Sequence, residues 1–181
     1  MPVARACATA GLAAATLAAA CAPLPQVPAP DTTPATCTAA GLRLDPAGRD
    51  AGMGHRALAF RYTNASPRPC SLGGYPEVRA LDVGGKPLAA LAAIPATRAT
   101  RSYLVPDGDA ATRVVQPGQG LWFAVTWSVI PHGNAPCPAM AALRITPPGA
   151  GTATGGVVVP AISSVCAGLH VLPLRTTPTE S

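Results

Sequence analysis

The stretch GLWFAVTWSVI, residues 120–130, decides the fold class. Every second position from Leu121 onward is apolar, and Ala, Thr, Ser and one Trp lie between these positions. A period of two is typical of a β-strand that buries one face against a core. The predicted strand presents these side chains to the core: Leu121, Phe123, Val125, Trp127 and Val129.

The surroundings of this core face raise two further expectations. Trp122, on the opposite face, is a candidate binding residue, although we favour an ordinary packing contact within that face. The turn residues Pro117 and Gly118 precede the strand, so we expect residues 114–127 to form a hairpin. Gly120 is then available for a positive φ or for a bulge.

Other segments carry the same period-two signal. In HRALAFRYTN, residues 55–64, the larger side chains share one face: Leu58, Phe60 and Tyr62. Turn signals rich in Pro, Gly, Asn and Asp separate a further set of weaker strand patterns. These weaker patterns occur at residues 41–44, 75–82, 98–104, 111–115, 140–146, 156–160 and 168–174. Only residues 88–99 have a helical candidate, and Pro95 interrupts it.

Composition agrees with many short strands joined by turns. The chain has 181 residues, of which 22 are Pro and 18 are Gly, and aromatic residues make up only 4%. This length suits one domain with a leader or tail. The sequence therefore predicts an all-β fold, an antiparallel β-sandwich that is immunoglobulin-like, after a disordered leader and a Pro-rich spacer.

The first 21 residues, MPVARACATAGLAAATLAAAC, have the form of an export signal. Arg5 supplies a positive charge, and the uncharged residues 6–20 are too few and too rich in Ala for a membrane-spanning helix. We expect residues 1–20 to be a signal peptide. Their end, LAAAC, resembles the lipobox of bacterial lipoproteins, so Cys21 is the expected lipidation site.

The lipobox match departs from the usual pattern at two positions. Leu17 lies four residues before the cysteine, and Ala18 stands where a larger aliphatic residue is commoner. Ordinary cleavage after Ala20 and plain secretion therefore remain the alternative. The segment that follows favours an anchor, because residues 21–36 are rich in Pro and Thr and predict an extended spacer. The β-sandwich is expected at residues 37–175, with a flexible tail at 176–181.

A cysteine interrupts a turn in the stretch YTNASPRPCSLGGYPEV, residues 62–78. Asn64 and Ser66 are expected to turn the chain, and two prolines prevent the preceding strand from continuing. Turns rarely need a cysteine. We therefore interpret Cys70 as one half of a disulfide that ties this turn to Cys37.

Four cysteines remain in the predicted domain once Cys7 and Cys21 are assigned to the leader and the anchor. Export to an oxidising compartment makes disulfides the first interpretation, and four cysteines allow three pairings. We favour Cys37–Cys70 and Cys137–Cys166, because each pair joins neighbours in the sequence. The two crossed pairings stay open, since sandwich folds allow them.

A metal site is the competing interpretation of the later cysteines. His132 precedes Cys137 and His170 follows Cys166, so that a site with two Cys and two His ligands can be drawn. The spacings are loose and no CxxC pair is present. We therefore expect no metal and no other cofactor.

The order of these motifs resembles a known family. A strand ending in TN leads to CSLGGYPEV, then to a PGQ turn before an aromatic strand, and two later cysteines precede CAGLHVLPL. This order is similar to domain of unknown function 4232, over about residues 37–174. The resemblance implies an exported β-sandwich with paired cysteines. That family has no established activity, so it transfers no catalytic residue.

Neither nucleic-acid binding nor catalysis has a visible signal. The net charge is +5, but the arginines are scattered rather than gathered in a basic stripe. Motifs such as G-x-S-x-G, HExxH and the P-loop are absent, and nothing selects one of the histidines His55, His132 and His170 as an acid or base.

We therefore expect an exported lipoprotein of the cell membrane that faces the periplasm or the outside. Its domain would be a binding or structural module at the cell envelope and not an enzyme. Its partners would be the membrane, through the lipid, and an envelope protein or a small ligand, but no nucleic acid. A small periplasmic or secreted enzyme and a metal-handling domain are the alternatives.

Overall fold

The computed structural model describes residues 33–96, 109–150 and 156–176. Several expectations lie outside these residues, namely the signal peptide 1–20, the anchor Cys21, most of the spacer, the strand at 98–104 and the end of the tail. The described part contains one 3-10 turn, η1 (Ala39–Gly41), and eleven strands. The strands are β1 (Leu42–Gly52), β2 (His55–Asn64), β3 (Cys70–Leu72), β4 (Glu77–Leu81), β5 (Pro87–Ala92), β6 (Ile94–Pro95), β7 (Arg113–Val115), β8 (Gly120–Ser128), β9 (Ala139–Thr146), β10 (Val157–Ser164) and β11 (Ala167–Val171).

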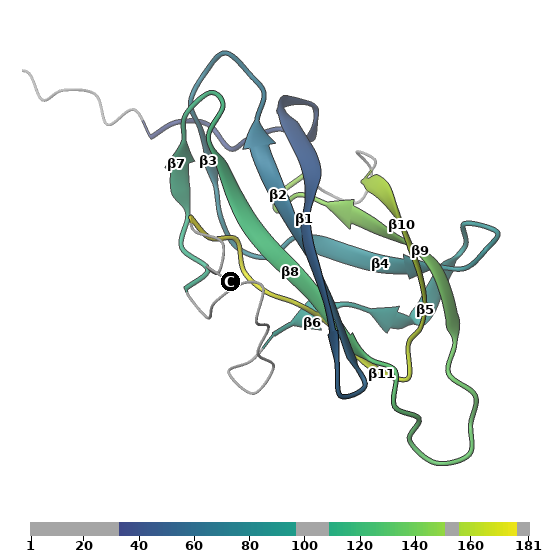
Figure 1. Cartoon of the computed structure of the whole chain (residues 1–181). Helices are drawn as coiled ribbons and strands as arrows, with labels where there is room; N and C mark the ends of the chain where they lie inside the picture. The colour runs from purple at the N-terminus through teal and green to yellow at the C-terminus, as the bar shows by residue number, and fades with distance from the viewer. Residues whose placement is uncertain (1–32, 97–108, 151–155, 177–181) are drawn as a thin grey trace, which may run out of the picture. The chain divides into compact units, whose positions relative to one another are not determined.

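Two main sheets and one small sheet organise these strands (Figure 1). The five-stranded sheet has the order β1-β2-β8-β11-β6, and the four-stranded sheet has the order β10-β9-β4-β5. All of their pairings are antiparallel except the short β11–β6 pair. The small sheet pairs β3 with β7.

The strand order is that of an immunoglobulin-like sandwich, as the sequence predicts. Strands β1, β2 and β8 pair as strands A, B and E do, and β10-β9-β4-β5 reproduces the order G-F-C-C′. The C-terminal strand β11 lies beside β8, in the place that strand D takes in that fold. The last strand that the structure describes therefore lies inside the five-stranded sheet, between β8 and β6.

One apolar core fills the space between the two main sheets. Phe60 of β2 stacks on Phe123 of β8 with ring centroids 5.4 Å apart, and Tyr62 stacks on the same ring at 5.4 Å. Leu143 and Ile145 of β9 belong to the same buried cluster. The alternation in residues 120–130 therefore identified the core face correctly.

The second face of β8 is more buried than its alternation predicts. Ala124 is fully buried there, and it packs with Ala59 of β2 and with Leu172, which follows β11. Small side chains let neighbouring elements approach closely, so this face forms a second, minor core. Strand β8 is thus buried on both faces over its central part.

The expected hairpin at residues 114–127 is wrong. Gln116–Gln119 does form a turn, in which the Gln119 N–H donates to the Gln116 carbonyl at 2.9 Å and Gly118 has a φ of 79°. Pro at the second position and a positive φ at the third are typical of a type II turn. However, β7 pairs with β3, whereas β8 pairs with β2 and β11, so the turn carries the chain from one sheet to another.

Two other local expectations also differ from the structure. Residues 88–99 are not helical where they are described, because β5 and β6 occupy this region up to Pro95. The weak strand at 41–44 extends to Gly52 and forms a hairpin with β2, through a two-residue turn at Met53 and Gly54 with φ of 47° and 79°. Two positive φ angles are typical of a type I′ turn.

Candidate functional site

The side chain of Asn64 lies at the centre of the stretch that carries the family resemblance. Asn64 is the last residue of β2 and is fully buried. Its Nδ2 donates to the carbonyls of Arg68, at 2.8 Å, and Val115, at 2.9 Å. Its Oδ1 accepts from the Ser66 N–H at 3.0 Å and from the Ser66 hydroxyl at 2.7 Å. All of its hydrogen-bonding capacity serves the protein itself, which indicates a structural role.

The backbone of Asn64 connects the same strand end to the PGQ turn. Its N–H donates to the Gln119 carbonyl at 2.8 Å, and its carbonyl accepts from the Gly118 N–H at 2.8 Å. The TN motif and the PGQ turn therefore meet at one residue. The backbone and side chain of Asn64 therefore hold the two motifs together.

Two disulfides fix the chain on either side of the sandwich. Cys37 is bonded to Cys70 with Cα atoms 4.9 Å apart, and Cys137 is bonded to Cys166 with Cα atoms 4.5 Å apart. These are the pairs that we favour from the sequence. The Cys37 N–H also donates to the Ser71 carbonyl at 3.0 Å, so the entering chain is held by backbone as well as by sulfur.

The disulfides bear directly on the alternative metal site at His132 and His170. Cys137 and Cys166 are bonded to each other, so neither offers a thiolate to a metal. Among the residues that the structure describes, no group of three or more His, Cys, Asp or Glu side chains is placed to hold a metal ion. The candidate set drawn from the sequence is therefore not assembled.

The histidines lie on different elements. His55 begins β2, His132 follows β8 in a loop, and His170 lies in β11. The Nδ1 of His170 is buried without a hydrogen-bond partner, and burial lowers the pKa of this imidazole. Burial thus favours the neutral form of this half-buried histidine.

Trp122 contacts an arginine of the neighbouring strand. It lies opposite Arg61 in the β2–β8 ladder, and the Arg61 guanidinium carbon is 4.6 Å from the centre of the indole ring. This distance is typical of a cation–π contact. Trp122 therefore has a packing partner within its own face of the sheet.

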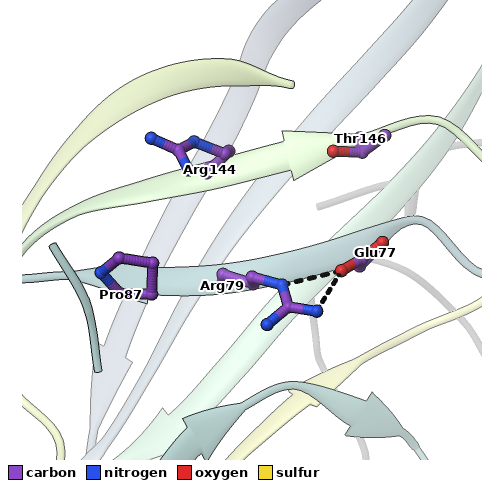
Figure 2. Close-up of a pocket in the computed structure, with 5 residues that line it drawn as sticks. All are labelled: Glu77, Arg79, Pro87, Arg144 and Thr146. Atoms are coloured by element: carbon purple, nitrogen blue, oxygen red, sulfur yellow. Dashed lines mark hydrogen bonds and ion pairs between the residues drawn. The ribbon is translucent and has the colours of Figure 1, made fainter. Parts of the chain in front are cut away.

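A pocket of about 320 Å³ opens on the outer face of the four-stranded sheet (Figure 2). Its lining residues come from β4, β5 and β9: Glu77, Arg79, Pro87, Arg144 and Thr146. The register of β4 and β9 explains this grouping, because Glu77 lies opposite Thr146 and Arg79 lies opposite Arg144. Residues separated by two in a strand share a face, so all four side chains reach the same surface.

The two arginines of this pocket differ in their partners. Arg79 donates from Nε to Glu77 Oε1 at 2.7 Å, and its Nη2 lies 2.7 Å from the same oxygen. Figure 2 shows Arg79 turned toward Glu77, whereas the Arg144 side chain extends away from that pair. Within the described part of the chain, Arg144 makes no ion pair and no hydrogen bond through its side chain.

A comparison with protein families assigns the domain. The family model described as "Domain of unknown function (DUF4232)" matches residues 37–179. The chain belongs to this family. The DUF4232 domain thus begins at the cysteine of the first disulfide and includes both disulfides. No curated protein and no solved structure matches the chain significantly.

Sequence reasoning missed the pocket of the DUF4232 domain, although it placed most of the lining residues in strands. Arg79 falls in the predicted strand 75–82, and Arg144 falls in the predicted strand 140–146. Nothing in either segment states that they pair, or in which register. A signal was nevertheless present, because an arginine on the outward face of each predicted strand is a charge that such pairing can bring together.

Proposed function

We propose that this chain is an exported lipoprotein, held at the cell envelope through Cys21, whose β-sandwich acts as a binding or structural module. The two disulfides carry the first part of the proposal, because they suggest an oxidising, extracytoplasmic environment. The leader with its LAAAC end supports export, and the Pro-rich spacer supports a tether. No residue of the described part lies in a helix long and apolar enough to cross a bilayer.

The binding or structural role rests on the way the described polar groups are used. Asn64, the strongest motif residue, is saturated by internal hydrogen bonds, and the histidines lie on separate elements. General acid–base chemistry needs a positioned acid or base within a shared site. The pocket on β4, β5 and β9 offers guanidinium groups instead, which bind anions and do not exchange protons near neutral pH.

Fractionation of cells that express the full chain tests the anchor. The unchanged protein should sediment with the membranes and should incorporate labelled fatty acid. The Cys21→Ala variant should lose the label and become soluble. The matched control is Cys7→Ala, which removes a cysteine of the leader and should leave membrane retention unchanged. A wild-type protein that is fully soluble and unlabelled would contradict the anchor.

A further inference from the structure

We propose that the pocket lined by Glu77, Arg79, Pro87, Arg144 and Thr146 binds a small ligand through an oxyanion, either a carboxylate or a phosphate group. The inference deepens the proposed binding role by naming the chemical class of the ligand. It does not depend on the anchor, since the pocket belongs to the folded sandwich. We call it the arginine pocket.

The first argument is a shortage of negative charge. The arginine pocket holds two guanidinium groups and one carboxylate, and a single oxygen of Glu77 serves two nitrogens of Arg79. Arg144 is left with its full set of donors. Guanidinium groups of this kind prefer planar oxyanions, which they contact through two parallel hydrogen bonds.

The second argument is that the other described carboxylates are already engaged elsewhere. Asp45 pairs with Arg43 at 2.8 Å, and Asp109 pairs with Arg113 at 2.7 Å. Asp50 accepts from the Ala51 N–H, and Asp82 accepts from two N–H groups of its own turn. Among the described residues no acidic side chain therefore serves Arg144.

The third argument is the register of the two strands. Arg79 and Arg144 are direct cross-strand partners. Like charges directly opposite each other destabilise a sheet. An oxyanion that contacts both guanidinium groups removes this repulsion, so the sheet itself favours the bound state. Figure 2 shows that the two arginine side chains point in different directions.

The fourth argument is a hydroxyl group among the residues that line the pocket. Thr146 is only 7% exposed, and its Oγ1 makes no hydrogen bond within the described residues. Thr146 thus adds a neutral donor beside the two charged ones. Pro87, on the remaining side, gives the pocket an apolar wall suited to the carbon skeleton of a small organic anion.

Equilibrium dialysis of the full-length protein, purified from whichever cell fraction contains it, tests the proposal. Radiolabelled succinate and inorganic phosphate are the two probes, at constant ionic strength. Saturable binding of at least one is expected, and the tighter probe distinguishes a carboxylate ligand from a phosphate ligand. Binding of neither probe would overturn the proposal.

Two pairs of variants separate the arginine pocket from general electrostatic attraction. Arg144→Gln should weaken binding about tenfold or more, as loss of a charged hydrogen bond does. Its control, Arg49→Gln, removes the same charge from an exposed position on β1 and should change nothing. Glu77→Gln removes the carboxylate that pairs with Arg79, so the affinity for the probe should increase. Its control, Asp45→Asn, makes the same charge change on β1 and should leave the affinity unchanged.

Equal effects of Arg144→Gln and Arg49→Gln would overturn the site. If Arg144→Gln fails to fold, the comparison of Glu77→Gln with Asp45→Asn tests the site instead. Equal affinities of these two variants for the probe would also overturn the site. These results are independent of fractionation. A soluble wild-type protein that binds succinate would refute the anchor and retain the arginine pocket.

Discussion

At the scale of single residues, Asn64 supplies the donors that a proline-containing loop lacks. Pro67 and Pro69 have no N–H, so the carbonyl of Arg68 between them needs a donor from elsewhere. The Asn64 amide and the Ser66 hydroxyl both donate to it, and the Asn64 amide donates to the Val115 carbonyl at the same time. One buried side chain thus replaces the backbone ladder where β2 ends.

Replacing Asn64 by Ala should lower the free energy of unfolding by about 3 kcal/mol. The reason is that the buried Val115 carbonyl loses its donor, at roughly 1–3 kcal/mol for an unsatisfied group, and the part-buried Arg68 carbonyl keeps only the Ser66 hydroxyl. Ser66→Ala is the matched control, because it removes only a part-buried partner and should cost about 1 kcal/mol. Urea denaturation of both variants measures the difference. Equal costs would show that the Asn64 amide is not the centre of this hydrogen-bond network.

His170 should make stability depend on pH in mildly acidic solution. Burial lowers the pKa of its imidazole in the folded state, whereas the unfolded chain has the ordinary value of about 6.5. Below that value the unfolded chain binds the proton more readily, so stability should fall as the pH falls from about 6.5. His170→Gln should flatten this slope, and His55→Gln, at an exposed position, should not. Denaturation midpoints, measured between neutral and mildly acidic pH, give the slope of stability against pH for each variant. A slope that His170→Gln leaves unchanged would contradict the role of His170.

At the scale of elements, the two glycines of the QPGQG segment are required for different reasons. Gly118 has a φ of 79° and open space around it, so Ala there meets only backbone strain of about 1–2 kcal/mol. Gly120 has an ordinary φ, but a Cβ there would collide with the carbonyl oxygen of Tyr62 on the paired strand. Gly120→Ala should therefore destabilise the protein more than Gly118→Ala. Thermal unfolding of the two variants tests this order, and a reversed order would contradict it.

The sequence predicted strands well where packing repeats at every second residue, as in 55–64 and 120–130. The prediction from sequence failed where the structural preference of the residues conflicts with the strand pairing that the fold imposes. Pro46 and Gly48 suggest a turn, yet β1 passes through them with a bulge and continues to Gly52. The run of Leu and Ala after Pro87 suggested a helix, because both residues have high helix propensity, but tertiary pairing with β4 makes it a strand.

The candidate site was less predictable than the fold for a related reason. Hydrophobic periodicity states which face of a strand is buried, but it does not state which strand lies alongside. The pairing of Arg79 with Arg144 joins segments far apart in the chain. The arginine pocket depends on that register, so it appears only in three dimensions.

At the scale of the whole molecule, the disulfides secure both ends of the domain. Cys37 and Cys70 are 33 residues apart, and the bond ties the chain entry to β3. Cys70→Ala should lower the free energy of unfolding by roughly 2–5 kcal/mol, as loss of a native disulfide does. It should leave Cys37 as a free thiol and the Cys137–Cys166 pair intact. Peptide mapping without reduction tests this, and a rearranged pair would contradict the independence of the two bonds.

One edge of the four-stranded sheet, strand β10, has a consequence for self-association. Strand β10 is an edge strand with three consecutive valines, and its Val157, Val158 and Ile162 are exposed. Such an edge is a template on which further chains can stack into fibrils. Pro160 interrupts it, because it has no N–H to donate, and the register shifts between Pro160 and Ser163. This proline acts as a gatekeeper that lets an apolar strand remain at the surface without seeding aggregation.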